Sequence, residues 1–241
     1  MDDSLIDEGY RLFAPYRVGD RLTVSDRVSD QEQAELLRTP LRSVTGDQLR
    51  RGLMVSPSAG RDGVREQKHF LPRMAELLLA GDDSFAVVPD YALRRLYLSE
   101  HADLWPDDER DWLARLGAAD LRSVLASPPA DGREARDVIV RYANAGLDHR
   151  SLLSQWSADW TVTALRHLGI MLSTFAAFDP DTGELADLAD ATSPGALTDD
   201  IVAWVNLERP RSLAATQHAL LTGELTPDET ADLERLYDWL S

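Results

Sequence analysis

The chain of 241 residues contains no cysteine and only one lysine, Lys68. Without cysteine there is no disulfide, no thiolate nucleophile and no cysteine-ligated zinc. The other basic residues are arginines. Codon bias in a GC-rich genome explains this usage more simply than selection for bidentate recognition by the guanidinium group.

Long apolar runs are also missing. The longest nearly apolar stretch, 169–178, is much shorter than the roughly 20 residues that a membrane-spanning helix needs. The N-terminus shows no basic segment followed by an apolar one, so we expect no secretion signal. These absences predict a cytoplasmic protein without membrane contacts.

Charge is unevenly balanced and unevenly placed. Acidic residues outnumber basic ones by 42 to 25, and the formal net charge is −17. Segment 175–241 holds 14 acidic residues and three arginines, whereas segment 42–73 holds seven basic and three acidic residues. An acidic surface repels nucleic acid, whose binding begins with phosphate neutralisation, and it suits a basic protein partner. Solubility alone is the competing explanation.

Helix-start signals recur along the chain. Capping boxes, in which Ser or Thr precedes Glu or Gln by three residues, predict helix starts at Ser29, Thr45 and Thr226. Pro106, followed by three acids, predicts another. Further starts are expected at Thr198, at Ser212, and at Ser157 or Asp159.

Apolar residues return at every third or fourth position through most of the chain, which is typical of helices packed around a core. We therefore predict an all-α fold, either a multi-helix bundle or an irregular helical solenoid in two layers. Segments 17–28 and 85–88 are the places where a short strand would be tolerated. The pattern favours one domain, 1–241, with a candidate hinge near 127–132 between N-terminal and C-terminal helical layers.

The most distinctive sequence motifs are KHFLPR at 68–73, ELL at 76–78 and WP at 105–106. In these motifs the chain resembles a family of bacterial hypothetical proteins that has no agreed activity. The similarity extends from about Leu12 to the C-terminus. The resemblance implies a single bacterial helical unit, and it implies no substrate.

The first of these motifs contains a candidate binding site. Pro72 either starts a helix or kinks one that begins near Asp62. A kink would free backbone carbonyls near His69 and leave Lys68 and Arg73 close by, as an anion-binding corner. The alternative is that the apolar residues of this segment are core and that Pro72 only shapes their packing. The candidate binding residues are His69, Arg73, Trp105 and Asp108.

No catalytic, cofactor or metal motif is recognisable, so we assign no catalytic residue and expect neither cofactor nor metal. The five histidines never lie three or four residues apart, and no helix can offer a local pair for zinc. Acid pairs such as 107–108 and 199–200 stand at expected helix starts, where the helix dipole explains them. Trp156 and Trp160 are expected on one side of a helix.

These features favour a non-enzymatic helical interaction protein of the bacterial cytoplasm. Its acidic C-terminal part would bind a basic protein surface, as an immunity protein or a toxin inhibitor would. The alternative is an enzyme whose site is assembled from distant residues, with His69, Arg73 and Asp108 as candidates. A nucleic-acid mimic is a third hypothesis.

Overall fold

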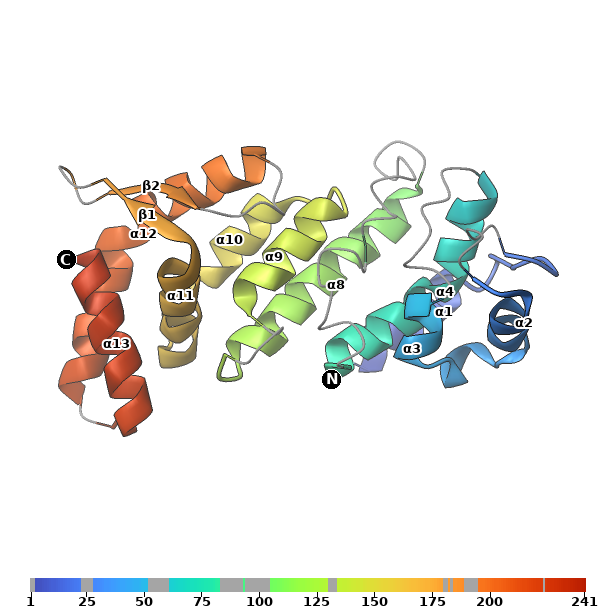
Figure 1. Ribbon diagram of the computed structural model, residues 1–241, viewed down its shortest axis with the longest axis horizontal. Helices are drawn as coiled ribbons and strands as arrows, with labels where there is room; N and C mark the ends of the chain where they lie inside the picture. The colour runs from blue at the N-terminus through green and yellow to red at the C-terminus, as the bar shows by residue number, and fades with distance from the viewer. Residues whose placement is uncertain are drawn as a thin grey trace. The chain divides into compact units, whose positions relative to one another are not determined.

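The computed structural model describes most of the chain, and the described part is mainly helical (Figure 1). The described residues are 3–22, 28–51, 61–82, 93, 105–129, 134–179, 182, 184–188, 195–222 and 224–241. The predicted all-α multi-helix fold is confirmed, with one small antiparallel hairpin formed by β1 (Ala176–Phe178) and β2 (Leu185–Leu188). Within these residues, no helix combines the length and apolar character that crossing a membrane demands.

Backbone contacts divide the chain into two compact units. Unit 1 comprises 1–120 and 141–147, and unit 2 comprises 121–140 and 148–241. The division passes inside two helices, α8 (Asp107–Leu125) and α9 (Ala135–Asn144). Part of the candidate hinge at 127–132, residues 130–132, lies outside the described residues. The single domain with that hinge stays a prediction.

Helix starts in unit 1 follow the local signals in the sequence. Ser29 and Glu32 form a complete capping box, and so do Thr45 and Gln48, as predicted. Both boxes satisfy backbone N–H groups that the first turn leaves without helical partners. Unit 1 also contains the first part of α8 and the end of α9. Its other helical elements are α1 (Asp3–Leu12), α2 (Asp30–Arg38), the short 3-10 helix η1 (Leu41–Ser43), α3 (Gly46–Leu49) and α4 (Arg61–Ala80).

Helix α4 begins at Arg61 and contains Pro72 in its interior. Of the two predicted roles for Pro72, starting a helix is therefore wrong. The residues around it are core: Phe70, Leu71 and Met74 are at most 2% exposed. Their burial supports the packing alternative for this segment, because apolar side chains removed from water stabilise the helix against its neighbours.

Aromatic side chains form the centre of unit 1. The fully buried ring of Trp112 lies 5.2 Å from that of Phe13, and its Nε1 donates to the Leu5 carbonyl at 2.9 Å. Gly9 of α1 faces the same ring: a Cβ atom there would lie 2.4 Å from Trp112 Cζ2. The absence of a side chain at Gly9 thus lets α1 approach the indole.

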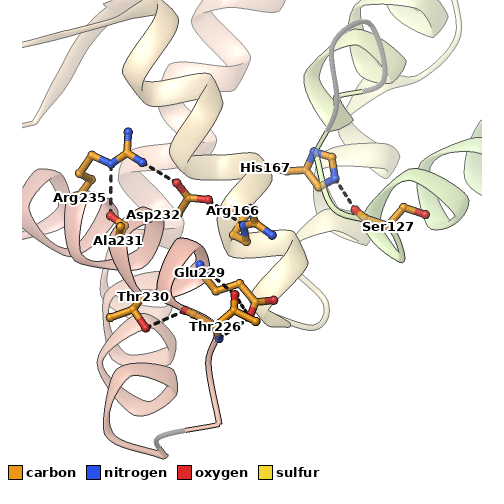
Figure 2. A network of polar contacts seen from close by, with 9 residues as sticks. All are labelled: Ser127, Arg166, His167, Thr226, Glu229, Thr230, Ala231, Asp232 and Arg235. Carbon is orange, nitrogen blue, oxygen red and sulfur yellow. Dashed lines mark hydrogen bonds and ion pairs between the residues drawn. The ribbon is translucent and has the colours of Figure 1, made fainter.

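Unit 2 contains a group of consecutive helices near the C-terminus. In Figure 1, α13 (red) packs beside both α11 and α12, in agreement with their contacts. The predicted capping box of Thr226 and Glu229 is present at the start of α13 and is drawn in Figure 2. Unit 2 also contains the end of α8 and most of α9. Its other helices are α10 (His149–Trp156), α11 (Val162–Phe175), α12 (Gly195–Thr222) and α13 (Pro227–Leu240).

Three expected helix starts in unit 2 are wrong. The expected starts at Thr198 and Ser212 belong to one helix, α12, which begins at Gly195 and continues through Pro210. The buried Ser212 hydroxyl does not cap a new helix but donates to the Arg209 carbonyl in the preceding turn. The expected helix start at Ser157 or Asp159 is replaced by Thr161, whose side chain accepts from the Ala164 N–H.

As a result, Trp156 and Trp160 do not share a helix. Trp156 ends α10, and Trp160 precedes α11. Both rings instead contact Trp204 of α12, at centroid distances of 5.2 and 6.0 Å. The prediction of stacking along one helix is corrected to an aromatic cluster between segments that are distant in sequence. The strand expected at 85–88 lies outside the described residues, as do 23–27 of the other expected strand segment, whose remaining residues are not in a strand.

We expect Gly9→Ala and Gly169→Ala to change stability in opposite directions. Alanine at Gly9 forces Trp112 or α1 to move, and such overpacking costs about 1–3 kcal/mol. At Gly169 of α11 the nearest atom, Leu236 Cβ, would lie at an ordinary 3.7 Å, so the lower entropy of the unfolded chain should stabilise by roughly 0.5–1 kcal/mol. Urea unfolding of both variants measures the two changes, and equal signs would contradict the packing described.

Candidate functional site

The single lysine is buried in unit 1 beside an acid. Lys68 Nζ lies 2.6 Å from Glu109 Oε2, and both side chains are about 5% exposed or less. The Tyr16 hydroxyl connects the two, since it accepts from Lys68 at 3.0 Å and donates to Glu109 Oε1 at 2.6 Å. Burial, followed by the bond to Glu109, raises the pKa of Tyr16. The tyrosine is therefore a neutral bridge within an ion pair.

Aromatic rings complete the surroundings of Lys68. Its ammonium lies 4.3 Å from the centroid of the Trp105 ring and 4.7 Å from that of Tyr16. A desolvated cation is stabilised by the negative faces of such rings. An acid, a hydroxyl and two aromatic rings surround the Lys68 ammonium. These contacts compensate its buried charge, so Lys68 has the environment of a structural residue.

The structure brings two of the four candidate binding residues close to this cluster. Trp105 is 4% exposed and covers Lys68. His69 lies 3.1 Å from the Tyr16 carbonyl through Nδ1, so the neutral ring donates to that oxygen. Burial lowers the pKa of His69. Both side chains are therefore engaged by the protein's own groups.

Of the other two candidates, Arg73 lies outside this cluster, whereas Asp108 stands next to it and its charge contributes to the raised pKa of Tyr16. Arg73 donates through Nε to the Val44 carbonyl at 2.7 Å and through Nη1 to Glu76 at 2.8 Å. Asp108 is exposed in the first turn of α8, where its Oδ1 accepts from the Glu109 N–H. The four residues consequently do not converge on one anion-binding corner, and their role in binding stays a prediction.

Unit 2 contains a histidine beside a carboxylate. His149 Nε2 lies 2.7 Å from Asp200 Oδ2, and Arg150 donates to both oxygens of the same carboxylate at 3.0 Å. Bonds from Arg150, then from His149, lower the pKa of Asp200. The bidentate arginine shows that Asp200 joins α10 to α12 as an ion-pair acceptor. Among the described residues, no group of three or more His, Asp or Glu side chains could hold a metal ion.

A shallow groove lies between α11 and α13. Arg166 donates through Nε to Asp232 Oδ2 at 2.8 Å, and Arg235 reaches Asp232 Oδ1 at 2.6 Å (Figure 2). The carboxylate thus stands between the two guanidinium groups and offsets part of their charge. This arrangement joins the helices, and it explains the groove without a ligand. The lining residues are Arg166, Gly169, Ile170, Ser173, Asp232, Arg235 and Trp239.

His167 is a buried histidine that connects three segments of unit 2. Its Nδ1 accepts from the Ala135 N–H at 3.3 Å, and its Nε2 lies 3.1 Å from the carbonyls of Val124 and Ser127. Figure 2 shows the contact with Ser127. These partners assign the proton of the neutral ring to Nε2. A second proton, on Nδ1, would face another donor. Burial accordingly lowers the pKa of His167.

The outer surface near the C-terminus carries unpaired acids. All three arginines beyond Phe175 are bonded within the protein, to Leu240 carbonyl, to Glu208 and to Asp232. No described basic side chain lies within ion-pair distance of the exposed acids that follow. These are Glu224, Asp228, Glu234 and Asp238. The net negative charge of this segment is therefore presented to solvent.

Sequence reasoning identified some of these features and missed others. Tyr16 and Glu109 were not recognised, although a single lysine among so many arginines was a usable signal. The acidic concentration in 175–241 was recognised from composition alone.

No protein-family model, no curated protein and no solved structure matches this chain. The resemblance to bacterial hypothetical proteins therefore stays a prediction, and function is inferred from the described residues.

Removing one partner of the buried ion pair should be costly. We expect Lys68→Met to destabilise unit 1 by about 3–5 kcal/mol, because Glu109 is left buried without its cation. Replacing both partners by apolar residues, Lys68→Met with Glu109→Leu, should cost less than the single change. Urea unfolding gives both values. The matched control is Arg115→Met, which breaks the exposed pair with Glu8 and should cost about 1 kcal/mol or less.

His167 should make stability depend on pH. Because its pKa is lowered in the folded state, the unfolded chain gains a proton first as the pH falls through about 6.5, and the free energy of unfolding decreases. His167→Gln should flatten this decrease between about pH 7.5 and pH 5.5, measured by urea unfolding at each pH. His218→Gln, on an exposed side chain of α12, is the control; an unchanged slope in His167→Gln would refute the assignment.

Proposed function

We propose that this chain is a non-enzymatic protein-interaction module of the bacterial cytoplasm that binds a basic protein partner through the acidic surface of its C-terminal segment. An immunity protein or a toxin inhibitor is the role that such a surface suits best. The observation that carries the proposal is the combination of 14 acidic residues against three arginines in 175–241 with the internal use of all three arginines.

The outer face of α13 illustrates this surface. Asp228, Glu234 and Asp238 are exposed, and Glu234 and Asp238, four residues apart, share a side of the helix. Arg235 lies on the same side, but it is bonded to Asp232. A basic partner would meet a negative potential here, which speeds association and favours the correct partner over acidic competitors.

The enzymatic alternative has less support. It requires His69 and Arg73 to be available to a substrate, yet His69 is bonded to the Tyr16 carbonyl and Arg73 to Val44 and Glu76. The raised pKa of Tyr16 also opposes its use as a base. These side chains have structural partners that account for their positions.

The test is affinity capture from an extract of the source organism. Immobilised wild-type protein should retain a basic protein at about 20 mM salt and release it near 500 mM, because salt screens exposed charges. The variant Asp228→Asn/Glu234→Gln/Asp238→Asn should lose that protein. The control Asp3→Asn/Asp20→Asn/Asp111→Asn makes the same change in net charge at exposed positions of unit 1 and should retain it.

Equal capture by the two triple variants would contradict the proposal, since binding would then follow total charge and not this surface. Absence of any salt-sensitive protein on the wild type would contradict it as well.

A further inference from the structure

The His167 ring of α11 caps two other helices of unit 2 at the same time. Ala135 is the first residue of α9, so its N–H has no partner within that helix. It donates instead to His167 Nδ1. On the other side of the ring, Nε2 serves the carbonyls of Val124 and Ser127, at the end of α8, where helical acceptors also lack partners. One imidazole thus completes the end of α8 and the start of α9.

Only the neutral ring can form both caps. A neutral imidazole has one donor and one acceptor, whereas the cation has two donors and no acceptor. A proton on Nδ1 would therefore place two N–H groups face to face at Ala135. It would also put a positive charge at the positive end of the α9 dipole, while the Nε2 side, at the negative end of the α8 dipole, favours a cation. Protonation consequently opposes one cap and leaves the other intact.

The contact between Ala135 and His167 is dry. Ala135 is fully buried, and His167 is 1% exposed. A buried N–H that loses its acceptor is costly unless water replaces that acceptor. Water can reach the Ala135 N–H only when the first turn of α9 moves away from α11.

The charged groups near the ring do not hold a cation in place. Burial lowers the pKa of His167, Arg166 of the same helix adds to this lowering, and Asp137 of α9 opposes it. Asp137 is already ion-paired with Arg136 at 3.0 Å, which offsets its attraction for an imidazolium. At the end of α8, the nearest ionisable residue in sequence is the exposed Arg122, which is also basic.

We propose that His167 is a pH-sensitive cap: when it takes up a proton it releases the first turn of α9 from α11, and it keeps its bond to the end of α8. The release is local and goes beyond the pH dependence of global unfolding, which any histidine buried in its neutral form would produce. His149 provides the contrast within unit 2. Its ring lies beside the Asp200 carboxylate, so a proton gained there strengthens the contact. The proposal is independent of the acidic surface and of its partner.

The test is amide hydrogen exchange of the full chain, followed residue by residue by NMR and corrected for the intrinsic exchange rate at each pH. The protection of the Ala135 N–H should fall by about tenfold between about pH 7.5 and pH 5.5. The reason is that the released ring, with its ordinary pKa of about 6.5, gains a proton in this range and the held ring does not. The Ala126 and Ser127 amides, bonded to the Arg122 and Val124 carbonyls at the end of α8, should keep their protection.

Urea separates local release from global unfolding. Opening one helical turn exposes little surface, so exchange at Ala135 should be insensitive to about 1 M urea, whereas global unfolding responds to it. These wild-type measurements decide the proposal without any substitution.

Two matched variants assign the effect to this ring. His167→Gln keeps one donor and one acceptor but takes up no proton in this range, so the protection of Ala135 should be the same at both pH values. His149→Gln removes the histidine beside Asp200 and should keep the tenfold response of the wild type.

Protection of Ala135 that does not change with pH in the wild type would overturn the proposal. So would an equal loss at Ala126 and Ser127, because the ring would then leave both helix ends together. A urea-sensitive loss at Ala135 would assign the effect to global unfolding, and a persisting response in His167→Gln would assign it to another group. Each of these results rejects the cap and leaves the proposed recognition of a basic partner untouched.

Discussion

Charge neutralisation inside the protein decides what its surface carries. Lys68 is paired with Glu109 and Arg141 with Asp120, and all four side chains are nearly inaccessible to solvent. An unpaired charge in such places would be strongly destabilising. Near the C-terminus the three arginines are bonded to groups of the protein itself, although Arg211 and Arg235 are exposed. Each buried pair hides one acid together with one base, so the excess of 42 acidic over 25 basic residues is left to the rest of the protein, and this excess is the basis of the proposed recognition of a basic partner.

Helix α12 is continuous although it contains a proline. A proline inside a helix removes one backbone donor and usually bends or ends the helix, yet α12 extends over 28 residues with Pro210 within it. Inward side chains such as Trp204 are buried, and their packing offsets the cost of the proline. The exposed leucines Leu207 and Leu221 therefore belong to one helix and not to two.

Local features of the fold were predictable, and contacts between distant segments were not. The capping boxes at Ser29, Thr45 and Thr226 form as predicted because each involves residues only three positions apart. The start of α11 was misjudged, since Ser157, Asp159 and Thr161 are all acceptable caps by sequence. The packing of Trp156 and Trp160 on Trp204 distinguishes these caps only in three dimensions. For the same reason the partners of His69 and Arg73 could not be foreseen.

The sequence by itself determined that the protein is helical, free of disulfides and strongly acidic toward its C-terminus, because periodicity, caps and composition act through near neighbours and totals. Only the tertiary structure decided which charges are hidden and which leucines are left in water. Burial depends on segments that meet after folding, as when Glu109 reaches Lys68. Exposure at Leu207 and Leu221 follows from the same geometry: once one side of α12 is packed on the core, the opposite side remains in solvent.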